Sequence, residues 1–509
     1  MKLYALDKSV ENVDFSSFIN QYKRTLKSLF AERSNLEEIN LTRGLPPFVL
    51  RDVMSCSPLS VFVPSEYEGR GGDVAECLAV LEATSYESLP LSLLVGINGA
   101  LFLQPVSIYG SEEAKKSVYH RVIHQKNLGG LMITEPDFGS DALKMQTSYT
   151  ETDNGYHLQG TKHWAGLTGW ADYWLLTARR QNSKGELTRD IDFFIHDSHL
   201  KGIEVEEVFK NLGLYMLPYG RNKIDAHIPT AYKLEPKTNG ITMMLDILHR
   251  SRLQFPGMGM GFLKRMLDEA LDHCKERMVG GNSLFTYDQV KKRLSKIQSA
   301  FTVCSAMCAY TVENAKIDMD LSKMDVAANS VKTIITDYMQ DASQSLLQLV
   351  GAKGYRQDHI AGRAIVDSRP YQIFEGSNDI LYQQISESVL KGMRKMNISN
   401  LYEYLKDYDL STNSAELVKN SLDFSVDVKQ AQRKLVELGQ VLGRVFSLEM
   451  VIRLGEKGFR SDLINNSISN LQLEINNYLA SYKTEALPDI IDDYGDESDW
   501  KKFVQFQTT

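Results

Sequence analysis

The stretch Tyr371–Ile380 (YQIFEGSNDI) places a carboxylate between an aromatic residue and a glycine, just before an apolar run. Gly376 has no Cβ, so a backbone or a flat ligand can approach closely there. Ser377 and Asn378 suit a turn or an N-cap, and the apolar residues that follow recur at helical spacing. Glu375 would then lie against apolar surface, where the pKa of an acid rises and the group can act as a base. Taken alone, a glutamate here more simply complements the helix dipole.

The composition around this stretch is that of a soluble globular protein. The chain has 509 residues, 43% hydrophobic and 24% charged, which suggests two to four domains with large cores. The net charge of −8 argues against nucleic-acid binding. None of the five cysteines forms a CxxC pair, so we expect buried structural thiols, a reducing compartment and no metal site.

The N-terminus and the apolar runs bear on location. The start of the chain, MKLYALDKSVENVDF, is too charged for a signal peptide. We expect no apolar run long enough to be a transmembrane segment. A cytoplasmic protein is therefore predicted.

Hydrophobic periodicity changes twice along the chain, and this change predicts the fold class. Helical spacing dominates at both ends, with an apolar helix at 93–103 that Pro105 should stop. Short strands separated by turn residues fill the middle and suit a small antiparallel barrel or sandwich. We predict an α+β multidomain protein made of an N-terminal helical domain (1–128), a middle β domain (129–237), a C-terminal four-helix bundle (238–395) and an extra helical domain (396–509) that ends in an acidic solvated segment.

Four further motifs could carry chemistry, although each has a plainer interpretation. ITEPDFGSD (133–141) could bind a polar ligand through its turn, or be only a turn. The tryptophan of GTKHW (160–164) could stack on an aromatic cofactor, or belong to a core. The arginines of LHRSR (248–252), read as a helix start, could hold carboxylates or phosphates, and QLVGAKG (348–354) could be a glycine cap. GMGMG (257–261) lacks a preceding strand, so close helix packing is its expected role rather than dinucleotide binding.

Together with VPSEYEGRGG (63–72), these motifs stand in the order found in the acyl-CoA dehydrogenase family, which the chain resembles over about residues 60–392. ITEPDFGSD is similar to that family's TEP-x-x-GSD signature, GTKHW to G-x-K-x-W, and QIFEGSNDI to its aromatic-Glu-Gly segment. The resemblance implies bound FAD between the β domain and the C-terminal bundle, and α,β-dehydrogenation of an acyl thioester carried by coenzyme A or an acyl carrier protein.

The resemblance also implies a role for individual residues. Glu375 would be the catalytic base, because Ser251, the alternative position in some relatives, cannot serve as a carboxylate. The substrate would meet Ser140, Arg252, Phe374 and Gly376. The cofactor would be held by Leu131, Ile133, Thr134, Gly139, Ser140, Trp164, Gly166 and Ser377, and its adenosine part by Arg277 with Gln348 and Gly351 from a neighbouring subunit.

Departures from the family pattern leave alternatives open. Gly166 stands where a Thr or Ser usually donates to flavin N5, so a backbone N–H or Thr168 would have to replace it. This change resembles the acyl-CoA oxidase branch, so the electron acceptor could be electron-transfer flavoprotein or oxygen. The segment at 277–281 lacks the family's phenylalanine. A flavin-binding scaffold without turnover is the other alternative.

The extension resembles, in its placement, the extra helical domain of very-long-chain family members. This resemblance implies a homodimer.

Overall fold

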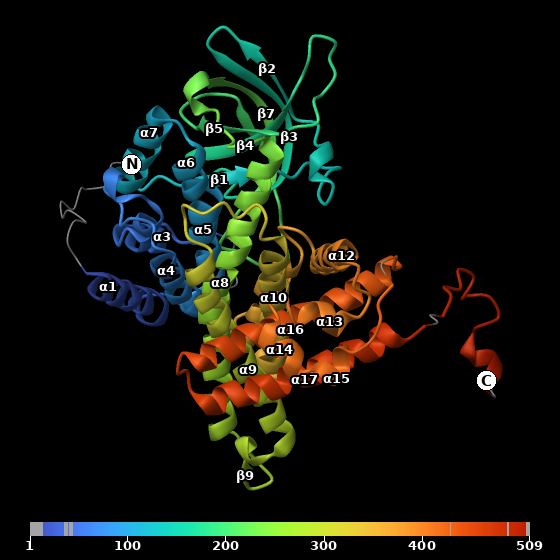
Figure 1. Cartoon of the computed structure of the whole chain (residues 1–509). Coiled ribbons are helices and arrows are strands. Elements are labelled where there is room, and N and C mark those ends of the chain that lie inside the picture. Colours follow the sequence, from blue (N-terminus) through green and yellow to red (C-terminus); the bar gives the residue numbers. More distant parts are fainter. Residues whose placement is uncertain (1–13, 35–38, 40–43, 428, 486–487, 505–509) are drawn as a thin grey trace.

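The computed structural model describes residues 14–34, 39, 44–427, 429–485 and 488–504 (Figure 1). It confirms the predicted fold class, with helices at both ends of the chain and a β-sheet region in the middle. The long helix α8 (Gly240–Glu276) passes from the β-sheet region into the bundle (Figure 1). Both regions are therefore built along one helix.

The N-terminal region is a cluster of helices that packs on α8. Its helices are α1 (Phe15–Lys27), α3 (Pro47–Ser55), α4 (Val74–Glu87), α5 (Leu89–Asn98), α6 (Gln104–Tyr109) and α7 (Glu112–Gln125). Short 3-10 and π turns join them, at η1 (Ser28–Glu32), η2 (Pro58–Phe62), η3 (Ser65–Tyr67) and η4 (Gly99–Leu103). Helix α4 lies against α8, where an added Cβ at Gly261 would approach the Glu82 carbonyl oxygen to 2.0 Å. Close helix packing, predicted for the GMGMG segment, is confirmed.

Pro105 does not end its helix, contrary to the prediction. The chain stays helical from Leu89 to Tyr109 because the π turn η4 comes first, and Pro105 then falls in the first turn of α6, where a missing N–H is tolerated. This stretch has the length and mean hydropathy (1.7) of a membrane span, although no apolar run of that length was predicted from the sequence. However, 89% of it is buried inside the fold, so the structure explains it as a core helix.

The middle region is a seven-stranded sheet. Its strands are β1 (Gly129–Met132), β2 (Ser148–Thr152), β3 (Gly155–Gly166), β4 (Tyr173–Arg180), β5 (Asp192–Asp197), β6 (Ile203–Val208) and β7 (Tyr219–Pro229), in the order β1-β4-β2-β3-β7-β6 with β5 on β4. The sheet is mixed rather than antiparallel, since β4 runs parallel to both β1 and β2. A parallel pair needs a long connection, and the segment through β2 and β3 provides it.

The C-terminal bundle consists of α8, α9 (Asp288–Asn314), α10 (Asp325–Val350), α11 (Ile360–Ser368) and α12 (Asn378–Met396). A small hairpin, β8 (Met278–Val279) and β9 (Asn282–Ser283), joins α8 to α9 at the end away from the sheet (Figure 1). The LHRSR segment lies inside α8 and not at its start, because the helix begins at Gly240 with Asn239 as its N-cap. The four residues after Leu248 are therefore buried side chains of a long central helix.

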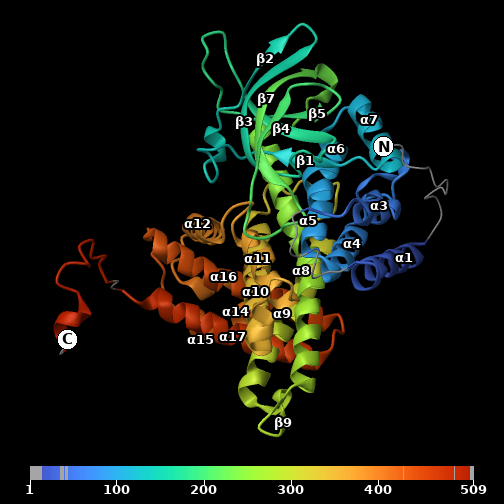
Figure 2. The same ribbon diagram turned by 180° about the vertical axis from the view of Figure 1, so that it is seen from behind.

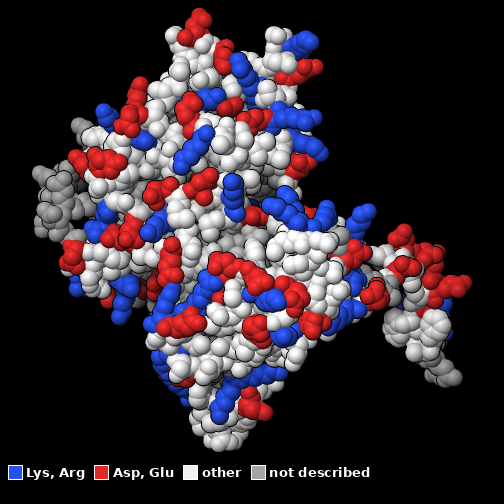
Figure 3. Space-filling view, viewed as in Figure 1, with Lys and Arg blue, Asp and Glu red and all other residues white. Residues whose placement is uncertain are grey.

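The extension contains α13 (Leu401–Leu405), α14 (Thr412–Leu417), α15 (Lys419–Leu422), α16 (Gln432–Glu456) and α17 (Ser461–Lys483). Helix α16 packs on α12, α9 and α10, and α17 packs on α16 and α9. Figures 1 and 2 place it on the side of the bundle opposite the N-terminal helices. The acidic segment 488–497 is exposed as predicted, and Figure 3 shows mixed charges over the rest of this face. Position 428 lies outside the described residues.

Candidate active site

The predicted base lies in a strained turn between two helical elements. The 3-10 turn η9 (Arg369–Gln372) precedes it and α12 follows it. Glu375 has φ 54° and Gly376 has φ 90°, so both adopt left-handed backbone. An added Cβ at Gly376 would meet Leu381 at 2.9 Å, which explains the glycine there. A left-handed glutamate is uncommon and marks a position held by its surroundings.

Two cationic side chains hold this turn by its carbonyl groups. Arg252 donates from Nε (3.1 Å) and Nη2 (2.8 Å) to the carbonyl oxygen of Glu375. Lys332 donates from Nζ to the carbonyl oxygen of Gly376 at 2.8 Å. Arg252 is itself fixed by Asn329 Oδ1 at 2.8 Å. The turn therefore keeps the Glu375 side chain in one orientation.

The carboxylate of Glu375 has one oxygen that is ready to accept a proton. Oε1 accepts a hydrogen bond from Ser251 Oγ at 3.0 Å. Oε2 is buried and has no hydrogen-bond partner among the described residues, although the residue as a whole keeps some exposure. Burial raises the pKa of Glu375, and the charge of Arg252, the Ser251 hydrogen bond and Lys332 only partly oppose it. A carboxylate in this state suits general base catalysis.

The Glu375 side chain borders a narrow cavity of about 10 Å³, which has room for about one water molecule. Most of its walls are apolar and come from α4, α5, η4 and α8, namely Leu81, Leu93, Gly96, Ile97, Ala100, Leu101 and Met258. Its polar groups belong to Ser251, Gln254 and Glu375. The walls are apolar up to the carboxylate, as the end of a hydrocarbon-binding site would require, but the cavity must widen to admit a chain.

Trp164 is presented outward by an irregularity in β3. The register of β3 with β7 shifts between Lys162 and Ala165, and Trp164 takes φ 55° in this bulge. Its side chain is 52% exposed although it belongs to a strand, and its ring lies 4.6 Å from that of Phe209. An exposed indole on a rigid sheet suits stacking against a flat ring system.

The surroundings of Gly166 are tight for the hydroxyl side chain that the family pattern would place there. A Cβ on Gly166 would lie 3.0 Å from Ile97 Cδ1 and 3.2 Å from Tyr219 Cε1. Thr168 does not replace it, since its hydroxyl donates to the Ala165 carbonyl oxygen and accepts from Asn222 Nδ2. Of the two replacements considered from the sequence, only a backbone N–H remains.

The two motifs of the β domain are joined by a buried ion pair that the sequence did not reveal. Lys162 of GTKHW donates to Glu135 of ITEPDFGSD at 3.0 Å, and both side chains are almost fully buried. Burial lowers the pKa of Lys162 to about 8. Burial alone would raise the pKa of Glu135. The charge of Lys162 and hydrogen bonds from the 146–147 segment outweigh burial, so the pKa of Glu135 is lowered. The pair holds the turn after β1 against the strand that carries Trp164.

The other predicted cofactor contacts of the β domain surround this pair. The carbonyl oxygens of Ile133 and Thr134 are already used, by Lys162 Nζ and the His163 N–H. Leu131 lies inside the β1–β4 ladder. Three hydroxyls make no hydrogen bond within the described part of the chain, those of Thr134, Ser140 and Ser377. Gly139 is exposed in the loop beside Ser140. These hydroxyls and the indole fit a polar, flat cofactor such as FAD.

The residues predicted to hold the adenosine part are distant from this site within one chain. Arg277 follows the last residue of α8, 26 residues after Ser251, which corresponds to about 39 Å along the helix. Gln348 and Gly351 are exposed at the C-terminal end of α10. Within one chain these residues therefore lie apart from the site around Glu375.

Phe374, a predicted substrate contact, lies next to Glu375, whereas Arg250 of the LHRSR motif bonds to other residues. Phe374 packs against Tyr371, with ring centroids 4.9 Å apart, and is partly buried next to Glu375. Arg250, in contrast, is buried with Asp246 and bonds to backbone carbonyls, so it is structural.

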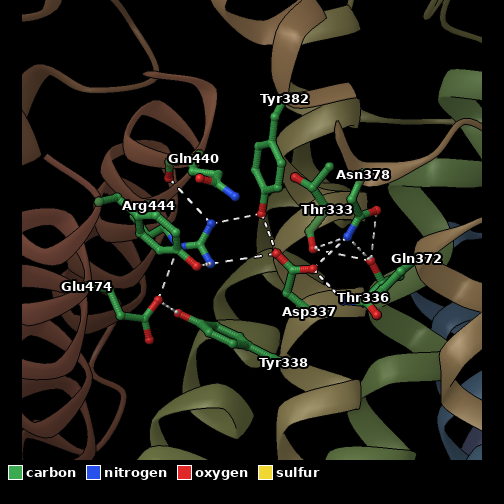
Figure 4. Close-up of polar contacts among 12 residues, drawn as sticks. Thr333, Thr336, Asp337, Tyr338, Gln372, Asn378, Tyr382, Gln440, Arg444 and Glu474 are labelled. Atoms are coloured by element: carbon green, nitrogen blue, oxygen red, sulfur yellow. Dashed lines mark hydrogen bonds and ion pairs between the residues drawn. The ribbon is translucent and has the colours of Figure 1, made fainter. Parts of the chain in front are cut away.

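Figure 4 shows a polar network that joins Gln372 and Asn378, on either side of the Glu375 turn, to residues of the extension. Asp337 Oδ1 accepts from Gln372 and Asn378, both at 2.7 Å, and these two residues flank the turn. Its other oxygen accepts from the Tyr382 hydroxyl at 2.6 Å. The buried Arg444 of α16 donates to that hydroxyl at 2.8 Å and to Glu474 at 3.1 Å. The extension thus contacts the support of the Glu375 turn.

Sequence reasoning missed Lys332, Asp337, Gln254 and Arg444. A charged residue within an otherwise apolar helical run was the available signal for Lys332 and Arg444, since such residues are rarely buried without a partner.

Models of three domains of the acyl-CoA dehydrogenase family match the chain: the N-terminal domain at residues 21–126, the middle domain at 130–226 and the C-terminal domain at 238–390. An acyl-CoA dehydrogenase of Bacillus subtilis is 25% identical over 342 residues, 66% of this chain and 87% of that protein. A glutaryl-CoA dehydrogenase of Desulfococcus multivorans is 27% identical over 345 residues, 66% of this chain and 86% of that protein.

Solved structures show the same fold. The acyl-CoA dehydrogenase of Bacillus anthracis complexed with FAD superposes with a TM-score of 0.76 at 18% identity, over 93% of this chain and 90% of that one. Butyryl-CoA dehydrogenase of Megasphaera elsdenii gives 0.66 at 20% identity, over 75% and 100%. The fold and the domain matches define an acyl-thioester oxidoreductase with FAD as its cofactor. The chain belongs to the acyl-CoA dehydrogenase family.

We expect Arg444→Met to destabilise the protein by about 3 kcal/mol, because it leaves Asp337 and Glu474 without their cation. We also expect it to slow flavin reduction by substrate, since Asp337 anchors both flanks of the catalytic turn. Chemical unfolding and stopped-flow absorbance would measure the two effects. The control Arg460→Gln removes an exposed ion pair with Asp462 and should leave the unfolding transition unchanged. Equal effects of the two substitutions would contradict the role of the network.

Proposed function

We propose that this protein introduces an α,β double bond into an acyl thioester, with Glu375 accepting the α-proton. The observation that carries the proposal is the buried, unpaired Oε2 of Glu375 at the edge of an apolar cavity. When bound, FAD supplies the acceptor for the hydride that leaves the β-carbon. The family and the acyl-thioester chemistry of the relatives' names support the reaction class.

The chain's own residues contribute position, desolvation and proton transfer. Arg252 and Lys332 fix the turn, so that the carboxylate faces the cavity and not solvent. Ser251 keeps Oε1 occupied and leaves Oε2 to take the proton. The apolar walls raise the pKa of Glu375, which makes it a stronger base toward the weakly acidic α-carbon. Trp164 would cover one edge of the flavin ring, and the free hydroxyls of Thr134, Ser140 and Ser377 would bind its polar groups.

A second candidate is an oxidase that passes electrons from the reduced flavin to oxygen. It is favoured by Gly166, which carries no side-chain hydroxyl and is closely approached by Ile97 and Tyr219. After anaerobic reduction by substrate, rapid return of the yellow colour in air with one peroxide per flavin would identify the oxidase. Slow return in air, with fast return on adding an electron-transfer flavoprotein, would identify the dehydrogenase.

The assembly is proposed to be a homodimer. A flavin site that includes Arg277, Gln348 and Gly351 of a neighbour needs at least two subunits, and the extension covers α9 and α12 on the face where it packs. Light scattering of the FAD-loaded protein would measure the mass, and a monomer would contradict the proposal.

We expect Glu375→Gln to keep bound FAD but to slow its reduction by a substrate thioester at least ~1000-fold, the scale of losing a general base. The measurement is anaerobic bleaching of the flavin absorbance with a panel of acyl-CoA and acyl carrier protein thioesters. Asp379→Asn is the matched control, because it removes an exposed carboxylate four residues away. Near-normal bleaching in Glu375→Gln would place the base elsewhere, and a yellow protein that no thioester bleaches would indicate a scaffold.

The rate of flavin reduction should rise with pH and then level off, because Glu375 acts in its deprotonated form. Since its pKa is raised, the midpoint should lie above that of an ordinary glutamate. Lys332 opposes this rise in pKa, and burial lowers the pKa of Lys332 itself to about 7. Lys332→Met should therefore move the midpoint to higher pH, whereas Lys391→Met on the exposed face of α12 should not. A midpoint that moves to lower pH would contradict this assignment.

A further inference from the structure

Gln254 lines the cavity that Glu375 borders and carries an unpaired buried oxygen. The residue is 3% exposed and lies on α8 among the residues that line the cavity. Its Nε2 donates to Gln104 Oε1 at 2.7 Å. Its Oε1 is buried, and no described residue gives it a hydrogen bond. Such an oxygen is a vacant acceptor within an otherwise apolar slot.

The buried thiol of Cys77 sets the orientation of this pair of amides. Cys77 Sγ donates to the Val61 carbonyl oxygen at 3.4 Å, so the sulfur is free to accept. Gln104 Nε2 donates to that sulfur at 3.9 Å, which leaves Gln104 Oε1 to accept from Gln254. Gln254 Oε1, and not its NH₂ group, is therefore the atom left for a ligand.

The position of Gln254 along α8 indicates which part of a substrate it would meet. Ser251 contacts the Glu375 carboxylate, and Gln254 follows it by three residues on the same helix face. Three residues correspond to a rise of about 4.5 Å along the helix. The acceptor is thus only a few carbon atoms beyond the reacting carbons. Met258, one turn further along, returns the wall to apolar character.

A saturated acyl chain would bury this oxygen without a partner. Water can satisfy the oxygen before substrate binds, but a chain that fills a narrow slot excludes water. Leaving this buried acceptor without a hydrogen bond lowers the affinity for a saturated chain about tenfold or more. A chain that carries a donor makes the missing hydrogen bond and avoids this loss. Sites built with a buried polar group reject analogues that lack its partner.

We infer that the substrates are acyl thioesters whose chain carries a hydrogen-bond donor, such as a hydroxyl or an amide N–H, a few carbons beyond the α,β-bond, and that Gln254 Oε1 accepts it. This assignment rests on the proposed function, since it names the substrate class of the same site.

The test compares coenzyme A thioesters of equal size in anaerobic flavin bleaching by the FAD-loaded protein. The pairs are 4-hydroxybutanoyl with pentanoyl and 5-hydroxypentanoyl with hexanoyl, in which a methyl group replaces the hydroxyl. We expect at least one hydroxylated member to reduce the flavin about tenfold faster than its partner at subsaturating concentration. Gln254→Leu should abolish or reverse this preference, and Met258→Leu, which changes the same wall without changing its polarity, should keep it.

The outcomes separate the inference from the function on which it rests. If no thioester of either kind bleaches the flavin, the proposed function fails and the inference fails with it. If saturated chains bleach the flavin as fast as their hydroxylated partners in the unmodified protein, only the inference fails, and this comparison needs no variant to fold. An unchanged preference in a folded Gln254→Leu protein, or faster bleaching by a 4-methoxy chain that can only accept, would also overturn it.

Discussion

The hydrogen bonds from Arg252 and Lys332 to two successive carbonyl groups are the constraint on which the site depends. A left-handed glutamate is unfavourable by about 1–3 kcal/mol and persists only where its neighbours enforce it. Here the enforcement comes from two helices, since Arg252 lies on α8 and Lys332 on α10. Because the cations bind the backbone and leave one carboxylate oxygen free, they orient the acid and moderate its raised pKa without neutralising it by a direct ion pair.

The β-sheet region uses the same principle on the other side of the proposed flavin position. Trp164 also has left-handed backbone, within a bulge of β3. The buried Glu135–Lys162 pair fixes the adjacent turn to the strand that carries it. The two residues with strained backbone, Glu375 and Trp164, are thus supported by buried charged groups. The strained backbone lies where a ligand is expected rather than in the core.

The local motifs could be found from the sequence because each consists of neighbouring residues. The residues that contact these motifs from distant parts of the chain could not be found in this way. The turn at Glu375 follows from the turn chemistry of the residues after it, whereas the sequence left the exposure of Trp164 open because it depends on the bulge in β3. Lys332 is 44 residues from the carbonyl that it binds, and the distance along the chain gives no sign of that contact. Pro105 misled the reading because a π turn, set by packing, precedes it. The parallel pairing of β1 with β4 likewise depends on tertiary contacts that strand propensity does not encode.

The polarity of the cavity is consistent with both of its proposed roles, raising the pKa of Glu375 and selecting the substrate. A base with a raised pKa needs walls that do not solvate its anion, and a charged residue near it would shift that pKa through electrostatic attraction or repulsion. Gln254 is neutral, so it can supply a specific acceptor without changing the charge balance around Glu375. Of the cations that act on Glu375, Lys332 has its charge offset by Asp337, and that carboxylate also pairs with Arg444 of the extension. Substrate selection and proton abstraction can therefore be altered separately, the first at the wall of α8 and the second at the turn.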